Sequence, residues 1–312
     1  MSVVVIGDAN VDLELRLPST EGVELHANPD PEVFGGGSAA NTAAALARLE
    51  VPCRFTGTVG DDDYGRLARR SLEKAGVDVA EVRTVTGSPT VMVIVVVTTD
   101  GERLIYVWPP TGGAHAALTA EHAVAAAGKA SWLHVSGVCL RVGPARDALL
   151  AAMDEASARG IPVSLDLNLR LENWGWDDNF REVATAAVAR SSVVFGAAMD
   201  EIMPLAQRPD AREAATKLAG EDRLVIARLG AEGSFACSKA GGVVSSPSFA
   251  VDVVDTVGAG DAFNAGFIAS RMAGGDLATA MRWGNATAAL SIGRRGARST
   301  PTRREVESLA AG

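Results

Sequence analysis

Short apolar runs alternate with longer alanine-rich segments along most of the chain. Strands are expected at the β-branched runs Val3–Ile6, Trp132–Val135, Val163–Leu165 and Leu224–Ala227. Helices are expected at Asn41–Leu49, Pro144–Ala158 and Phe180–Ala189. Continuous apolar strands separated by helices are typical of a mainly parallel sheet covered on both faces. The pattern therefore predicts an α/β fold that binds ligands beyond the carboxyl ends of its strands.

Two stretches interrupt this alternation. The segment Leu13–Phe34 is polar and contains prolines, while Thr90–Thr98 and Arg103–Trp108 flank Asp100-Gly101, a dipeptide that suits a tight hairpin. We expect these parts to form a small β-layer beside the main sheet, although periodicity alone fits ordinary core strands equally well. Without an internal repeat or a linker, residues 1–312 are expected to form one domain.

Composition narrows the classes of protein. The net charge is −9, from 29 Lys and Arg against 38 Asp and Glu, which argues against nucleic-acid binding. The longest apolar run, Val91–Val97, is much too short to cross a membrane as a helix. The three cysteines are far apart and form no C-x-x-C pair, so neither zinc nor a disulfide framework is indicated. We expect a cytoplasmic protein without membrane contact.

A glycine-rich segment near the carboxyl end, Val253–Phe267, is expected to run from a strand into an apolar helix. Glycines let the backbone approach a ligand, and the first N–H groups of a helix lack intrahelical partners, so this segment predicts an anion site. Gly258, Ala259 and Gly260 would supply its amide donors. Asp261 falls in the first turn, where the helix dipole favours the ionised form, and a carboxylate beside such donors suits phosphoryl transfer. Taken alone, the motif fits a helix cap better than catalysis.

A second glycine run, Phe34–Ala43, also leads into an alanine-rich helix. It formally matches G-x-G-x-x-A, but the polar, proline-containing segment Ser19–Val33 precedes it where a dinucleotide-binding fingerprint needs a buried strand. The chain also lacks the P-loop pattern G-x-x-x-x-G-K-[ST]. The remaining interpretation places glycine backbone against a polyol, with Asn41 bridging hydroxyls. Asn10 and Asp12 follow the first strand and would lie at the same edge, although such a pair is also common in turns.

Together the two glycine segments resemble the paired signatures of the ribokinase-like, or PfkB, carbohydrate kinase family. Gly35–Asn41 resembles the first signature, Gly57–Asp62 the next block and Asp255–Phe263 the second signature. Two matches in the right order are more specific than either loop alone. The resemblance implies a three-layer sandwich with a β-sheet lid inserted from about 13–34 and 88–110. Because this lid is often a dimerisation surface in the family, it also implies a homodimer.

The resemblance further implies a role for each matching residue. Asp261 would be the general base, and Gly258–Gly260 the anion hole, of a kinase that transfers the γ-phosphate of ATP to a hydroxyl, expected to be primary. Substrate contacts are implied at Asn10, Asp12, Gly36, Gly37 and Asn41, to which we add Trp108 and Arg170. Contacts with ATP are implied at Thr256, Gly258, Gly260 and Asn285. Asp255 and Gly293–Thr300 resemble a loop that holds a monovalent cation, expected to be K⁺, in some members.

The sequence departs from the family at the metal site. Members usually carry Asn-x-x-Glu, whose glutamate organises the waters of Mg²⁺. Here Val193–Ile202 supplies Asp200 and Glu201 but lacks the Asn. We expect Glu201 to bind Mg²⁺ through water, with Asp200 as second choice; a solvated carboxylate at a helix start is the alternative. The missing Asn leaves metal binding and rate open.

The substrate is indicated by a strand end and by the lid. Asp166-Leu-Asn168-Leu-Arg170 resembles a stretch in fructokinase-like and ketodeoxygluconate-kinase-like members. In sugar-acid kinases we expect an additional lid arginine, because guanidinium pairs with carboxylate in bidentate fashion. Trp108 stands there instead, which favours a neutral sugar. A nucleoside (adenosine-like) kinase using Trp108 for stacking, a sugar-acid kinase using Arg170, and a non-catalytic sugar-binding regulator remain as alternatives.

Overall fold

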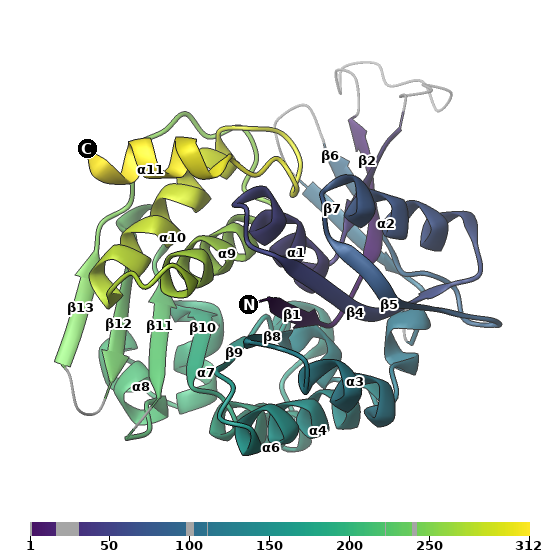
Figure 1. The fold of residues 1–312 in the computed structure, drawn as a ribbon, viewed down its shortest axis with the longest axis horizontal. Coiled ribbons are helices and arrows are strands. Elements are labelled where there is room, and N and C mark those ends of the chain that lie inside the picture. Colours follow the sequence, from purple (N-terminus) through teal and green to yellow (C-terminus); the bar gives the residue numbers. More distant parts are fainter. Residues whose placement is uncertain (1, 17–30, 98–102, 111, 222, 239–241) are drawn as a thin grey trace.

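The computed structural model describes residues 2–16, 31–97, 103–110, 112–221, 223–238 and 242–312. Within these residues a nine-stranded sheet forms the centre of the molecule (Figure 1). In spatial order its strands are β13 (Gly242–Ser246), β12 (Ser234–Ser238), β11 (Leu224–Arg228), β10 (Val193–Ala197), β9 (Val163–Asp166), β8 (Trp132–Ser136), β1 (Val3–Ile6), β4 (Cys53–Gly60) and β5 (Asp78–Val85). All neighbours pair in parallel except β11 with β12 and β12 with β13. The predicted mainly parallel sheet is confirmed.

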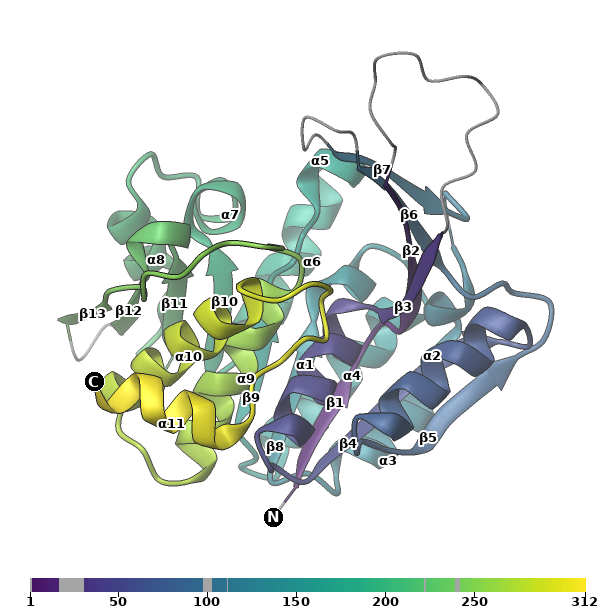
Figure 2. The same ribbon diagram turned by 90° about the horizontal axis from the view of Figure 1, so that it is seen from above.

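Helices cover both faces of this sheet, as the continuous apolar strands predicted (Figures 1 and 2). One face carries α1 (Ser38–Arg48), α2 (Asp63–Lys74), α9 (Ala259–Met272), α10 (Leu277–Ile292) and α11 (Arg303–Ala311). The other carries α3 (Ala120–Ala127), α4 (Ala145–Ala158), α6 (Asp178–Ala189) and α8 (Ala211–Leu218). Alternate residues of β1 enter the two hydrophobic cores, since Val3 and Val5 pack on the first face and Val4 and Ile6 on the second.

A smaller sheet stands beside the carboxyl edge of the main sheet, close to the short helix α5 (Leu171–Trp174) (Figure 2). Its strands, in order, are β3 (Glu32–Gly36), β2 (Asn10–Arg16), β6 (Met92–Val97) and β7 (Arg103–Trp108), which we call the lid sheet. The predicted β-layer is thus confirmed. Strands β6 and β7 pair antiparallel, whereas the Asp100-Gly101 turn expected between them lies outside the described residues, as do residues 17–30 of the first lid segment.

The strand expected directly before the carboxyl-terminal glycine loop is absent. Residues 251–258 form no regular element, and the side chains of Val253 and Val254 are exposed. The backbone N–H groups of Val254 and Asp255 both donate to the carbonyl of Ile292, so this segment is held by the end of α10 rather than by a sheet. The apolar composition of this segment does not show whether its backbone pairs with a neighbouring strand or with the end of a helix.

Two further expectations can be compared with the described part of the chain. Cys53, Cys139 and Cys237 are buried and free, so they form no disulfide there. Among the described helices, none is both long enough and apolar enough to span a bilayer.

Candidate active site

The carboxyl-terminal glycine loop leads into α9, and two of its backbone N–H groups donate no hydrogen bond within the described residues. Gly258 has φ of +79°, and a Cβ on it would lie 2.7 Å from the carbonyl oxygen of Ala297, so glycine is required for both backbone and space. The amides of Gly258 and Gly260 have no acceptor in the described part of the chain, whereas the Ala259 amide donates to the Thr256 carbonyl at 3.3 Å. The predicted anion hole therefore has free donors at Gly258 and Gly260, but the Ala259 donor is engaged.

Asp261 lies in the first turn of α9 and is buried. Its Oδ1 accepts a hydrogen bond from the Ser38 hydroxyl at 2.7 Å, and its Oδ2 accepts one from the Asn41 amide at 3.1 Å. Burial, with a smaller contribution from the nearby Asp166, raises the pKa of Asp261 to about 7. Loss of solvation therefore outweighs the helix dipole, which favours the ionised form. A base with a pKa near neutrality is suited to accepting a proton.

Asn41 connects Asp261 to an arginine that the sequence motifs did not indicate. The Asn41 Oδ1 atom accepts a hydrogen bond from Nε of Arg298 at 3.0 Å. The other nitrogens of Arg298 donate to the Gly36 carbonyl at 2.8 Å and to the Ser71 hydroxyl at 2.7 Å. Burial lowers the pKa of Arg298 to about 10, so it remains cationic at neutral pH. Both polar atoms of the Asn41 side chain are thus used within the protein, unlike the free hydroxyl-binding group that we expected.

Asn10, Asp12 and Gly36 come together on one face of the lid sheet. The Asn10 amide nitrogen donates to Asp12 Oδ1 at 3.4 Å, and a Cβ on Gly36 would lie 2.3 Å from that same oxygen. Burial raises the pKa of Asp12 to about 6, against the opposing effect of Arg298. The Asn10 Oδ1 atom is buried and has no hydrogen-bond partner among the residues described. Such an acceptor is costly to bury unpaired, which marks a place for a ligand donor.

Asp8 fixes the amino end of α1, another contact that sequence reasoning missed. Its carboxylate accepts the backbone N–H groups of Ser38 at 2.9 Å and Ala39 at 3.2 Å, so it caps a helix that begins thirty residues later. Gly37 has φ of +99°, and a Cβ there would lie 2.6 Å from the Asp8 carbonyl oxygen. Gly37 therefore packs tightly against the loop after β1, and its substrate contact stays a prediction. Asp8 in turn positions Ser38 toward Asp261.

A charged cluster lies at the carboxyl ends of β9, β10 and β11. Arg228 donates to Asp166 at 2.7 Å, to Asn264 Oδ1 at 3.0 Å and to the Gly260 carbonyl at 3.2 Å. The second carboxylate, Glu201, lies 3.7 Å from the same guanidinium. Arg228 therefore places a half-buried positive charge directly beneath the glycine loop. Neither Asp166 nor Arg228 was assigned to this loop from the sequence, because the cluster unites three separate strands.

Glu201 uses both carboxylate oxygens on backbone donors. They accept the N–H groups of Leu169 at 2.8 Å and of Ala197 at 2.7 Å, and burial raises the pKa of Glu201. Asp200, the second choice for the metal, is exposed. No group of three or more His, Cys, Asp or Glu within the described ranges could by itself enclose a metal ion. Because both oxygens of Glu201 are engaged, a Mg²⁺ ion near it would be held through water and phosphate oxygens rather than by direct coordination.

The predicted cation and ATP residues have different surroundings. Asp255 is buried, and its carboxylate accepts the N–H groups of Val257 at 3.1 Å and Gly296 at 3.0 Å, which joins it to the Gly293–Thr300 loop as the resemblance implied. Thr256 is exposed beside the glycine loop. The Asn285 side chain is buried away in contacts with Ser234 and with the carbonyls of Ser246 and Pro247, so both its polar atoms are engaged.

Arg170 and Trp108, the two added substrate contacts, lie differently with respect to Asp12. Arg170 has φ of +49°, is exposed, and lowers the pKa of both Asp12 and Asp261 electrostatically. Trp108 pairs with Met92, which pairs with Val11, so these side chains share one face of the lid sheet and that of Asp12 projects from the other. The structure therefore brings Arg170 toward the site but does not place Trp108 there.

A mainly parallel sheet covered by helices on both faces, with a small lid sheet beside it, is the ribokinase-like fold. The chain belongs to the PfkB family of carbohydrate kinases, since the family model described as pfkB family carbohydrate kinase matches residues 1–303. It is therefore a phosphotransferase that acts on sugars.

Individual relatives cover nearly the whole chain. An ATP-dependent ribose-1-phosphate kinase of Halopiger xanaduensis is 38% identical over 299 residues, which cover 95% of this chain and 93% of the relative. Aminoimidazole riboside kinase of Salmonella typhimurium is 35% identical and covers 94% and 89%. The solved structure of a fructokinase with bound ATP from Xylella fastidiosa superposes with a TM-score of 0.87 at 25% identity, covering 99% and 98%.

Proposed function

We propose that this kinase transfers the γ-phosphate of ATP to a sugar hydroxyl, with Asp261 as the general base. The observation that carries the proposal is the buried Asp261 carboxylate, with its pKa of about 7, in the same helical turn as the free amides of Gly258 and Gly260. The base removes the hydroxyl proton, and the amides stabilise the charge that develops on the transferred group. A non-catalytic sugar-binding regulator would have no need of a base poised in this way.

On the donor side, Gly258 and Gly260 would bind the phosphates and Thr256 would lie at the rim. Mg²⁺ would be held by Asp166 and Glu201 through water, and when bound it would neutralise phosphate charge. Arg228 keeps the glycine turn in place through the Gly260 carbonyl. The engaged side chain of Asn285 supports a role in holding α10 against β12 and β13 rather than in direct contact with ATP. A K⁺ ion would bind near Asp255, where the two loops meet.

On the acceptor side, Asn10 and Asp12 would bind sugar hydroxyls, and Asn41 would orient Asp261. The unpaired Oδ1 of Asn10 would accept a hydrogen bond from one sugar hydroxyl, and the half-buried Asp12 carboxylate would accept a hydrogen bond from another. A primary hydroxyl reaches a buried base with the least crowding. Carboxylates gather in this part of the site, at Asp12 and Asp261, which favours the neutral, polyol part of the substrate there.

A second candidate substrate is a sugar that carries a phosphate. Arg170 is an exposed guanidinium with no ion pair in the part of the chain that is described, and its charge reaches both Asp12 and Asp261. Arg170 would pair with an anionic group of the substrate while the polyol end of the substrate lies at Asp12. The 38% identity to a ribose-1-phosphate kinase supports this candidate. The Trp108 side chain does not project toward Asp12, so it supports neither a purely neutral sugar nor a stacked nucleobase as the substrate.

We further propose that the lid sheet mediates a homodimer of a single-domain, cytoplasmic protein. The face opposite Asp12 carries Leu104, Tyr106 and Trp108, whose side chains are 51%, 58% and 47% exposed. A row of exposed apolar side chains of this size favours burial against a second copy.

The proposal is tested by measuring ADP release with the wild-type protein and a panel of neutral pentoses and hexoses, ribose 1-phosphate, sugar acids and nucleosides, with and without Mg²⁺ and K⁺. Mg²⁺-dependent turnover of a sugar is expected, with Arg170→Ala weakening only substrates that carry a phosphate. Turnover of no compound in the panel would contradict catalysis, and preference for a sugar acid or a nucleoside would contradict the assignment of the acceptor.

A further inference from the structure

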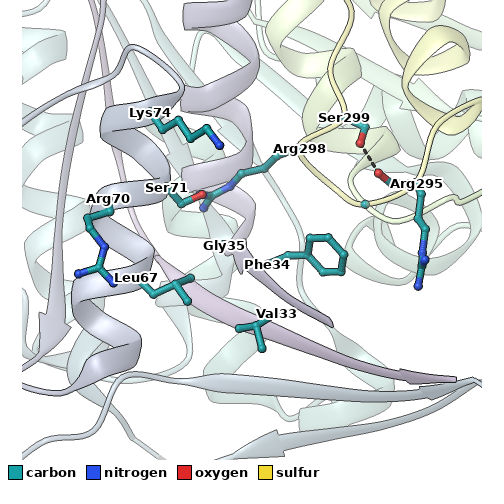
Figure 3. Close-up of a pocket in the computed structure, with 11 residues that line it drawn as sticks. Val33, Phe34, Gly35, Leu67, Arg70, Ser71, Lys74, Arg295, Arg298 and Ser299 are labelled. Carbon is teal, nitrogen blue, oxygen red and sulfur yellow. Dashed lines mark hydrogen bonds between the residues drawn. The ribbon is translucent and has the colours of Figure 1, made fainter. Parts of the chain in front are cut away.

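Outside the candidate active site, a groove separates α2 from the loop after α10. It consists of two adjoining cavities of about 420 Å³ and 360 Å³ that share Lys74, Arg298 and Ser299. Strand β3 and the carboxyl end of α1 complete its walls. Figure 3 shows the larger cavity, in which Lys74 and Ser71 of α2 point toward Arg298 of the loop. A concave volume of this size suits a small molecule.

The groove concentrates positive charge on an otherwise acidic chain. The described residues that line it include six cations and no aspartate or glutamate: Arg48, Arg70, Lys74, Arg294, Arg295 and Arg298. Arg294 pairs with Glu305, and Arg295 pairs with Glu14 and Glu32. The exposed Arg48, Arg70 and Lys74 have no ion pair or hydrogen bond within the described ranges. Three cations that lie near one another without an ion pair repel one another, and a bound anion would relieve this repulsion.

The donors in the groove match a phosphate group. Arginine and lysine are the preferred partners of phosphate, and the Ser71 hydroxyl adds a neutral group beside them. The remaining walls are apolar, with Val33, Phe34 and Leu67 suited to an organic portion of the ligand. Nucleic acid fits poorly, because it needs a long basic surface and the chain carries a net charge of −9.

Arg298 links this groove to the sugar site. It has five N–H donors, of which three are used on Asn41, Ser71 and the Gly36 carbonyl. Two N–H groups therefore remain for an anion in the groove. An anion in the groove that draws the guanidinium toward Lys74 would weaken two of its hydrogen bonds. One is to the carbonyl of Gly36, against which Asp12 packs. The other is to Asn41, which orients Asp261.

We propose that this groove binds a small phosphorylated anion as an effector, and that its occupancy changes the affinity of the sugar site through Arg298. The coupling rests on the proposed kinase function, whereas binding in the groove does not. By linkage, the sugar must alter the affinity for the effector by the same factor.

Calorimetry with inorganic pyrophosphate as the probe, in the absence of Mg²⁺, tests the binding site. In the double variant Arg48→Glu/Lys74→Glu, the affinity of the groove for pyrophosphate should be lowered roughly tenfold or more relative to the wild type. The matched control Arg208→Glu/Arg304→Glu makes the same change in net charge at exposed positions that do not line the groove, and it should bind as the wild type does. If the groove variant is unstable in a thermal melt, Lys74→Gln provides the same comparison with less charge change.

Equal pyrophosphate binding by the wild type and the folded groove variant would overturn the proposal, as would an equal loss in the control. Displacement of pyrophosphate by a short single-stranded oligonucleotide at lower concentration would show a nucleic-acid surface instead. The coupling is measured separately, as a change in sugar KM with pyrophosphate that is absent from Lys74→Gln. If pyrophosphate binds but no sugar is phosphorylated, the kinase assignment fails and the groove stands.

Discussion

The Asn41 side chain donates a hydrogen bond of 3.1 Å to Oδ2 of Asp261, across 220 residues of sequence. This contact joins the two glycine segments, because Asn41 lies in α1 behind the first and Asp261 lies in α9 behind the second. The same Asn41 accepts from Arg298, so a cation, an amide and a carboxylate form one chain. Asp261 is therefore positioned by the helices that follow both glycine segments.

Ser38 should set the acid limb of the pH profile. Its hydroxyl stabilises the ionised form of Asp261 and lowers its pKa, so Ser38→Ala should raise that pKa and move the acid limb of kcat/KM to higher pH. Ser191→Ala, which removes a buried hydroxyl remote from the site, serves as the control. An acid limb that stays in place in Ser38→Ala would show that Asp261 does not control the profile.

Gly36→Ala should weaken the sugar selectively. The new methyl group would lie 2.3 Å from Oδ1 of Asp12, so the Asp12 carboxylate must leave its position. Sugar KM should rise by about tenfold or more while KM for ATP changes little. Gly128→Ala is a fair control, since its methyl meets only the side-chain end of Arg159, at 3.3 Å. Equal effects on both substrates would mean that the first glycine run is structural.

Glu201→Gln should destabilise the fold, because an amide can accept only one of the two backbone hydrogen bonds from Leu169 and Ala197. Leaving a buried donor unpaired costs about 1–3 kcal/mol, which chemical denaturation can measure. Mg²⁺ dependence of kcat should change in the same variant if Glu201 also holds metal-bound water. Unchanged stability would argue that its backbone contacts are weak in solution.

Trp108→Glu should affect association more than chemistry. Because its side chain lies on the lid face opposite Asp12, the substitution should convert a dimer to a monomer in light scattering, with little change in affinity for ATP. Asp63→Asn, an exposed change on α2, should leave the oligomer intact. A wild-type protein that is already monomeric at all concentrations tested would contradict the dimer proposal.

Local pattern predicted the elements well and the long-range contacts poorly. β1 at Val3–Ile6 has the expected bounds, and Asp261 stands in the first turn of a helix as its glycines indicated. Arg298 could not be predicted, because its partners Gly36 and Asn41 are more than 250 residues away. The orientation of Trp108 depends on the register of β6 against β2, which no periodicity within a single strand specifies.

The stability of Asp261→Asn offers an independent check on burial of the carboxyl group. Asp261 has a pKa of about 7 in the folded chain, against its usual 3.8. Between about pH 4 and pH 7 the folded state keeps a proton on Asp261 that the unfolded state has lost. The free energy of unfolding therefore falls as pH rises through this range, and the whole loss is present above about pH 7. Asn carries no charge to bury. Asp261→Asn should therefore raise Tm at pH 8 and do so less at pH 5, as scanning calorimetry can determine.

Single-turnover phosphoryl transfer by Asp261→Asn, at saturating sugar and ATP, shows whether Asp261 accepts the proton of the sugar hydroxyl. The substitution keeps the side-chain shape but removes the base, so the transfer rate should fall by a factor of roughly 10² or more while both substrates still bind. Transfer at a rate close to that of the wild-type enzyme would contradict the account.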